Sequence, residues 1–465
     1  MNLKRLFATV GVLLGVSVVS ASERPNFLFI IADDCTFRDI GCYGGQAYTP
    51  NIDHLATEGM KFNHCFQATA MCSPTRHNIY TGLYPVKSGA YPNHTFTHPD
   101  VKSIVHYLKP LGYRVALSGK THINPPEVFP FEYSEVQKND TKSVIDFSAV
   151  EKLMKESSES GNPFALFACS NEPHGPFTKG VEFRKKYDAE EISLRPYIVD
   201  TDETRESYVK YLAEISFFDQ EVGRLLDLLE KYNLAKNTMV MVVSEQGNGY
   251  AFAKWSCYES GLGSAMIVRW PGKVKQGTET NALVEYVDVC PTFVDAAGGS
   301  LSDVLEGSSL VPLLTGKTDE HKKYVYGIQT TRGINGGAPY YPIRTIRDKN
   351  YRLIMNLTPE AKFYNGIVNG DWFKSWERKA EGGDEHAAAM IDRYHNRPAI
   401  ELYDVHADPY EMTNIAGRKA YEEVQQRLTK KLIEWMNAEG DKGLDTELSA
   451  DDRMGYNKKK REGTL

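Results

Sequence analysis

Short apolar runs that alternate with helical patterns constrain the fold of this chain more than any other feature. These runs occupy residues 27–32, 115–117, 164–169, 239–243 and 265–268. Runs of this length are typical of buried strands in a largely parallel sheet, and amphipathic segments between them indicate helices on both faces. The clearest helical pattern covers residues 202–231. We therefore predict a large, mostly parallel α/β sheet sandwiched by helices.

Polar clusters follow four of the predicted strands. They are Asp33-Asp34, Lys120-Thr121-His122, Glu172-Pro173-His174 and Glu245-Gln246. Ligands of open α/β sheets bind at the carboxyl ends of the strands, so we expect the four clusters at one edge. The adjacent carboxylates of Asp33 and Asp34 repel each other unless a cation lies between them, and Ca²⁺ or Mg²⁺ prefers such oxygen ligands. The alternative is that one carboxylate caps a helix and the other is solvated.

The two ends of the chain differ from its middle. Residues 1–21 have two basic residues, an apolar stretch and a small-residue cleavage site, which predicts a signal peptide and a periplasmic or secreted protein. No other segment approaches ~18 unbroken apolar residues, so we expect no stable membrane anchor. We assign residues 22–337 to the α/β domain. The short strand-like runs and late helix of residues 338–465 predict a smaller α+β subdomain with an antiparallel sheet.

Net charge and cysteine content limit the kinds of ligand and metal site that this chain can have. The net charge of −7 over 465 residues gives no general attraction to nucleic acid, so an anionic substrate must be held by a local basic site. The seven cysteines are an odd number without CxxC spacing, which excludes a regular zinc module and leaves room for one cysteine with a separate role. Cys72 is the candidate, in the run Met71-Cys72-Ser73-Pro74-Thr75-Arg76.

Several motifs together resemble one family. Cys72 to Arg76 is similar to the C-x-P-x-R signature of type I, formylglycine-dependent sulfatases of the alkaline-phosphatase superfamily. Further motifs match in the same order: Gly119-Lys120-Thr121-His122, Glu172-Pro173-His174, Ser244-Glu245-Gln246-Gly247, Lys254 and Glu401-Leu402-Tyr403-Asp404. The resemblance covers nearly all of the chain beyond residue 21. It implies that a formylglycine-generating or maturase enzyme oxidises Cys72 to formylglycine, whose hydrated form supplies the nucleophile.

The resemblance also implies a role for each matching residue. The metal, Ca²⁺ or alternatively Mg²⁺, would be held by Asp33, Asp34, Glu245, Gln246 and the modified Cys72. Arg76, Lys120 and Lys254 would neutralise the sulfate, His174 would protonate the leaving alcohol, and His122 would take a proton from the second hydroxyl of the diol. Glu245-Gln246 departs from the Asp-Asn or Asp-His of most members, and the longer side chains shift the ligand oxygens. Seven further histidines lack motif support, and we expect them to be structural or exposed: His54, His64, His77, His94, His98, His106 and His406.

The expected substrate is a sulfated glycan. Residues 125–133 and 341–344 are similar to heparan N-sulfatase (sulfamidase) and bacterial polysaccharide sulfatases, which suggests Arg332 or Arg344 as substrate-binding residues. O-sulfate and N-sulfate remain open alternatives. An arylsulfatase-like enzyme, a phosphoesterase of the same superfamily and a non-catalytic glycan-binding pseudo-sulfatase remain open as well.

Overall fold

The computed structural model describes residues 24–134 and 144–463. The predicted signal peptide lies outside these ranges. None of the helices within them has the length and apolar character that crossing a bilayer requires. All seven cysteines lie in the described ranges, and none forms a disulfide.

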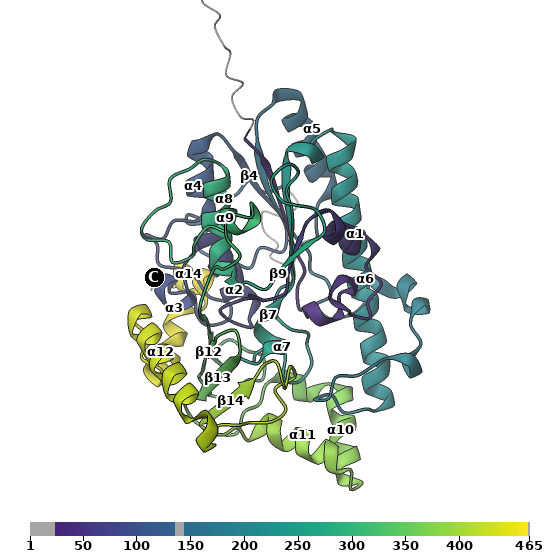
Figure 1. The fold of residues 1–465 in the computed structure, drawn as a ribbon, viewed down its shortest axis with the longest axis vertical. Helices are drawn as coiled ribbons and strands as arrows, with labels where there is room; N and C mark the ends of the chain where they lie inside the picture. The colour runs from purple at the N-terminus through teal and green to yellow at the C-terminus, as the bar shows by residue number, and fades with distance from the viewer. Residues whose placement is uncertain (1–23, 135–143, 464–465) are drawn as a thin grey trace, which may run out of the picture.

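A seven-stranded sheet forms the centre of the molecule (Figure 1). Its order is β4 (Arg114–Gly119), β5 (Phe164–Cys169), β1 (Asn26–Ile31), β6 (Thr238–Val243), β8 (Met266–Arg269), β2 (Met60–Phe62) and β9 (Thr278–Thr280). The first four strands are parallel, and β8 turns antiparallel to β6. Ile31 pairs with both Cys169 and Val243, so the parallel strands end level with one another.

Helices cover both faces of this sheet, as predicted. One face packs against α1 (Pro50–Glu58), α5 (Phe147–Ser160) and α6 (Asp202–Lys231). The other packs against α2 (Cys72–Thr81), α4 (Ile104–Leu108), α8 (Val289–Ala296) and α9 (Val311–Leu314). Alternate residues of β1 enter the two cores, with Leu28 in the first and Phe29 in the second. The predicted α/β sandwich is therefore confirmed.

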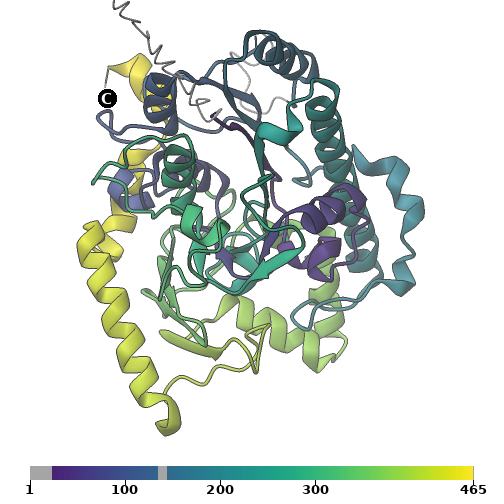
Figure 2. The same cartoon turned by 45° about the horizontal axis from the view of Figure 1, so that its top comes forward.

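The C-terminal part contains a four-stranded antiparallel sheet with a long helix on it (Figure 2). Its order is β11 (Val325–Gln329), β12 (Ile343–Arg347), β13 (Tyr351–Asn356) and β14 (Ile400–Asp404). Helix α12 (Glu422–Glu439) packs on β12 and β13. Because β11 precedes residue 338, this sheet takes its first strand from the range that we assigned to the larger domain. The boundary between residues 337 and 338 stays a prediction.

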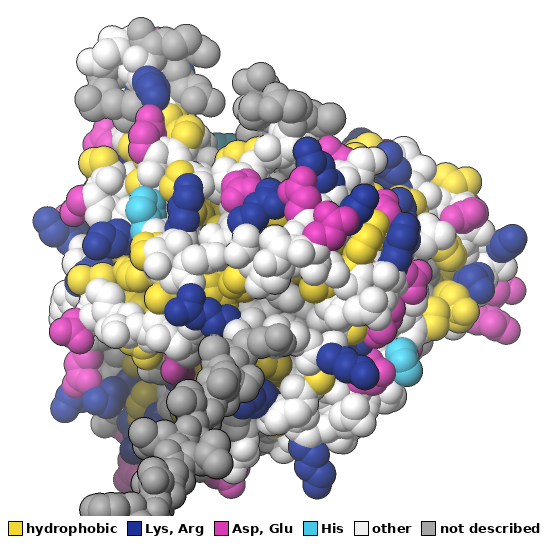
Figure 3. Space-filling model, turned by 90° about the horizontal axis from the view of Figure 1, so that it is seen from above, with side chains coloured by type: hydrophobic (Ala, Val, Ile, Leu, Met, Phe, Trp, Pro, Cys, Tyr) yellow, Lys and Arg dark blue, Asp and Glu magenta, His cyan; other side chains and the backbone are white. Residues whose placement is uncertain are grey.

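Short elements complete the described chain. They are α3 (Pro85–Ser88), α7 (Glu259–Leu262), α10 (Asp371–Glu381), α11 (Glu385–His395), α13 (Leu444–Leu448), α14 (Tyr456–Glu462), β3 (Cys65–Phe66), β7 (Gly263–Ser264) and β10 (Val284–Glu285). Buried ion pairs from Glu259 to Arg347 and Arg352 join α7 to the C-terminal sheet. Seen from above, basic and acidic side chains are interspersed on the surface (Figure 3). The described residues that are visible on that face form no single-sign surface of the kind that binds a polyanion.

Candidate functional site

The four polar clusters lie at the carboxyl ends of β1, β4, β5 and β6. Backbone hydrogen bonds join them: the Asp33 amide donates to the Glu172 carbonyl (2.9 Å), and the Cys35 amide donates to the Glu245 carbonyl (3.2 Å). The Lys120 amide donates to the carbonyl of Cys169 (2.8 Å). Because the parallel strands end level, these bonds fix the four loops around one buried space.

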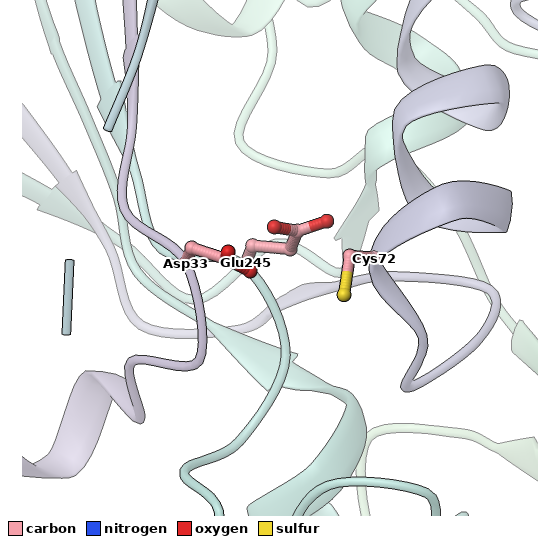
Figure 4. A group of neighbouring side chains, drawn as sticks. All are labelled: Asp33, Cys72 and Glu245. Atoms are coloured by element: carbon pink, nitrogen blue, oxygen red, sulfur yellow. The ribbon is translucent and has the colours of Figure 1, made fainter. Parts of the chain in front are cut away.

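Cys72 enters this space from the start of α2. It is the first residue of the helix, and it is 4% exposed. Pro74 sits in the first turn, where a missing N–H costs nothing, and its fixed φ favours helix initiation. The sulfur of Cys72 and single carboxylate oxygens of Asp33 and Glu245 all lie within 4.8 Å of one another. Figure 4 shows the three side chains close together, with Glu245 between Asp33 and Cys72 in this view.

Each basic side chain of the site is paired with a carboxylate. Arg76 Nη2 donates to Glu245 Oε2 (2.6 Å) between two fully buried groups. Lys254 Nζ lies 2.6 Å from Asp34 Oδ2, and Lys120 Nζ pairs with Asp33. Burial would raise the pKa of Asp33, but the charges of Lys120, His174 and Arg76 outweigh it and hold that pKa well below its usual value. Burial raises the pKa of Glu245 well above its usual value, although Arg76 acts against this shift. Each of the three basic side chains thus faces one carboxyl group inside the protein.

The remaining oxygens of the cluster fit a hard cation. Asp33 Oδ1, Glu245 Oε1 and Gln246 Oε1 are buried and have no hydrogen-bond partner among the described residues. Such groups are costly in a protein interior unless something coordinates them. Asp34 lies in the same cluster, but its two oxygens already accept from Gln246 Nε2 and Lys254 Nζ. Carboxylate and amide oxygens are the donors that Ca²⁺ and Mg²⁺ prefer, so the donor set suits the predicted metal.

The backbone is strained at several of these residues. Asp34, His122 and Gln246 have φ values of 61°, 51° and 45°, in the left-handed region that non-glycine residues rarely adopt. Each follows the end of a buried strand closely, so the sharp turn presents its side chain to the common space. Strain of this kind, on the order of 1–3 kcal/mol per residue, concentrates at functional sites.

The two predicted catalytic histidines occupy different places. The ring of His174 is partly exposed, with Nε2 3.6 Å from Asp34 Oδ2 and Nδ1 2.7 Å from the Gly175 carbonyl oxygen. His122 is more enclosed, and Nδ1 of its ring is buried without a partner among the described residues. Burial and the nearby charge of Lys120 hold the pKa of His122 well below its usual value, so its ring is neutral at pH 7. Nε2 of His122 contacts Nδ1 of His94 (2.9 Å).

His94 is the site residue that the sequence did not predict. No motif or spacing marks it, because it lies in a loop between two short helices and has a φ of 55°. Its contact with His122 depends on that turn. The only signal in the sequence was its histidine side chain, which it shares with eleven others.

The two arginines suggested for substrate binding differ in the structure. Arg344 is fully buried in β12, where its Nε and Nη2 donate to the carboxylate of Asp441. A guanidinium held in this way cannot contact a ligand from solvent, so the structure argues against the role that we suggested for Arg344. Arg332 is partly exposed and pairs with Asp451 on the surface. The Arg332 carbonyl accepts from the amide of Asn93, beside His94.

Comparisons with known proteins agree with this geometry. A family model described as Sulfatase matches residues 25–300, and one described as N-sulphoglucosamine sulphohydrolase, C-terminal, matches residues 247–365. An ulvan-active sulfatase from Formosa agariphila is 34% identical over 431 residues, which cover 90% of this chain and 81% of that protein. The human N-sulphoglucosamine sulphohydrolase is 25% identical, with 92% of this chain and 93% of that protein covered.

Solved structures share the fold. One of them, a protein in complex with its substrate D-glucosamine-2-N,6-O-disulfate, has a TM-score of 0.69 and 22% identity. The match covers 91% of this chain and 99% of that one. The Sulfatase family model spans more than half of this chain. The chain belongs to the sulfatase family, and it is a type I sulfatase and hence a sulfuric ester hydrolase.

Proposed function

We propose that this sulfatase is an exported enzyme that removes sulfate from a sulfated polysaccharide or its oligosaccharides. We further propose that it uses formylglycine derived from Cys72 together with a divalent metal. The observation that carries the proposal is the position of Cys72. It begins a buried helix, its sulfur lies within 4.8 Å of carboxylate oxygens of Asp33 and Glu245, and three basic side chains share the space.

The charge balance of the site supports a metal. Asp33, Glu245 and Gln246 each offer an unpartnered buried oxygen, and a bound Ca²⁺ or Mg²⁺ would supply charge neutralisation for the sulfate oxygens. Without a metal, Arg76, Lys120 and Lys254 are paired with the carboxylates of the site. A bound metal ion would take over those carboxylates, and the three basic side chains would then be available to bind an anion. The site would then bind cation and sulfate ester together.

The side chains divide the reaction into two steps. In the first, an oxygen of the hydrated formylglycine attacks sulfur in line, while Arg76, Lys120 and Lys254 hold the three sulfate oxygens. His174, whose ring is partly exposed beside Asp34, protonates the sugar oxygen as the S–O bond breaks. In the second, His122 takes the proton of the other hydroxyl, the carbonyl forms again, and the C–O bond to sulfate breaks. Neutral His122 suits that role, since a base needs a free electron pair.

Relatives support a saccharide substrate. The similar proteins are named for ulvan and for N-sulphoglucosamine, and a structural neighbour holds a disulfated glucosamine. Arg332, partly exposed next to the loop that carries His94, remains our candidate for substrate binding. The N-sulphoglucosamine sulphohydrolase model that matches residues 247–365 specifically favours a second candidate function, cleavage of N-sulfate.

A desulfation panel tests the proposal. The protein would be co-expressed with a maturase and incubated with ulvan, heparan sulfate and their oligosaccharides, in O-sulfated and N-sulfated forms, and released sulfate would be measured. We expect release of sulfate from one class of saccharide and no release of phosphate from phosphate esters. Glycan binding without release, from protein whose Cys72 is shown to be oxidised, would instead identify a non-catalytic binding protein. Recovery of chain cleaved after residue 21 from the periplasm or medium would support export.

A further inference from the structure

His94 and His122 form a pair of rings at the site. His94 Nδ1 lies 2.9 Å from His122 Nε2, and the ring centroids are 4.8 Å apart. His94 is exposed, whereas the other ring nitrogen of His122, Nδ1, is buried and has no hydrogen-bond partner among the described residues. One nitrogen of His122 is therefore buried and unpartnered among the described residues, and the other contacts a ring that reaches solvent.

The loop of His94 is fixed to the helix of Cys72. The backbone amide of Thr95 donates to Ser73 Oγ (3.3 Å), and Ser73 Oγ donates to the carbonyl of His122 (3.0 Å). Ser73 follows Cys72 directly, so one hydroxyl ties both histidine loops to the nucleophile's helix. The φ of 55° at His94 costs energy in a non-glycine residue and persists only where neighbouring contacts enforce it.

We propose that His94 is a positioning residue that accepts a hydrogen bond from His122 Nε2 and so makes Nδ1 of His122 the catalytic base. A neutral imidazole carries one hydrogen, and the partner of one nitrogen decides which nitrogen carries it. With the hydrogen on Nε2, the buried Nδ1 keeps its electron pair. This inference rests on the proposed function, in which His122 resets the formylglycine.

The proton and electrons balance in that step. Nδ1 of His122 takes the proton of the second hydroxyl, the C=O bond forms, and the electron pair of the C–O bond leaves with sulfate as a dianion. His122 then carries a positive charge in a buried place near Lys120, and the hydrogen bond from Nε2 to His94 Nδ1 becomes charge-assisted and stronger. After sulfate has left, a water molecule that enters the site accepts the proton from Nδ1 and passes it to solvent, which returns His122 to its starting form.

Two substitutions test the hydrogen bond between His122 and His94 while they preserve the backbone turn at residue 94. Asparagine and glycine both tolerate a left-handed φ, so His94→Asn and His94→Gly preserve the turn. The amide oxygen of asparagine takes the place of Nδ1 as an acceptor, whereas glycine offers no side chain. His98→Asn is the matched control, because His98 is exposed in the same loop and has no contact with His122 among the described residues.

The assay uses matured full-length protein and an activated aryl sulfate, whose phenol leaves without acid help, so that sulfate release limits turnover. We expect His94→Gly to lower kcat by about tenfold to a hundredfold. A burst of phenol should precede the slow phase, and quenched enzyme should carry the mass of one sulfo group at the Cys72 peptide. His94→Asn and His98→Asn should stay within a few-fold of the original enzyme. Added imidazole should restore part of the rate of His94→Gly.

Two results would overturn the inference about His94 and leave the proposed function standing. In the first, the His94→Gly enzyme turns over at the original rate without a burst. In the second, the His94→Asn enzyme is as slow as the His94→Gly enzyme. The first removes any role for His94 in sulfate release, and the second removes the acceptor role. Failure of the proposed function is recognised separately. In that case the unaltered protein, with Cys72 oxidised, releases no sulfate from any ester.

Discussion

Replacing Gln246 by methionine removes one oxygen from the proposed metal site with little change in volume. Each unpartnered buried polar group costs roughly 1–3 kcal/mol, so Asp33, Glu245 and Gln246 leave on the order of 3–9 kcal/mol for a cation to recover. At a cation concentration 100 times its Kd, the free energy of unfolding rises by about 2.7 kcal/mol. With an unfolding entropy of about 2.1 cal/mol/K per residue, 465 residues convert this into a Tm increase of ~3 °C.

The assay is thermal unfolding after chelation, with Ca²⁺ or Mg²⁺ titrated back. We expect the unaltered protein to gain ~3 °C and Gln246→Met to gain about 1.5 °C or less at the same concentration, because one lost ligand raises Kd by roughly tenfold or more. Gln329→Met is the matched control: Gln329 is also fully buried with an unpartnered Oε1, but it lies in β11. It should keep the full cation response. No response in the unaltered protein, or a full response in Gln246→Met, would refute the reasoning.

Two further predictions concern the catalytic acid and the buried arginine. His174→Ala should lower kcat/KM on a saccharide sulfate by roughly 10²–10⁴ and much less on an activated aryl sulfate; equal losses on both substrates would rule out His174 as the leaving-group acid. Arg344→Ala should lower the free energy of unfolding in urea by about 3–5 kcal/mol, because it leaves Asp441 buried without its partner. Arg332→Ala should leave stability nearly unchanged and raise KM for the glycan, and the reverse pattern would contradict both assignments.

The four polar clusters of the site could be predicted because their position at the ends of the parallel strands follows from the fold. Parallel strands end at one edge, so Asp33 after β1 and Glu245 after β6 had to lie near each other once the sheet was recognised. Arg76 could be placed beside Cys72 because four residues of helix bring two side chains to the same face. The boundaries of α6 could be predicted because its apolar residues recur at helical spacing over thirty residues.

Contacts of residues that belong to no motif, and whose partners are distant in the sequence, could not be predicted in this way. Arg344 was assigned to substrate binding because its sequence neighbours gave no sign of Asp441, 97 residues later, which buries it. His94 was overlooked because its contact with His122 depends on a left-handed turn that no local pattern encodes. The first strand of the C-terminal sheet was placed in the larger domain, since a strand's sheet is decided by its partner β12 and not by its own residues.

The central claim is that the nucleophile is an oxygen of formylglycine made from Cys72, and not the thiol of unmodified Cys72. Burial raises the pKa of that thiol to about 11, so an unmodified Cys72 is protonated at neutral pH. The most direct measurement is the fraction of Cys72 peptide that carries the aldehyde, determined by mass spectrometry in preparations made with and without a maturase, alongside kcat for sulfate release. We predict that kcat is proportional to the aldehyde fraction and vanishes with it. Full activity in protein whose Cys72 is entirely thiol would contradict the account.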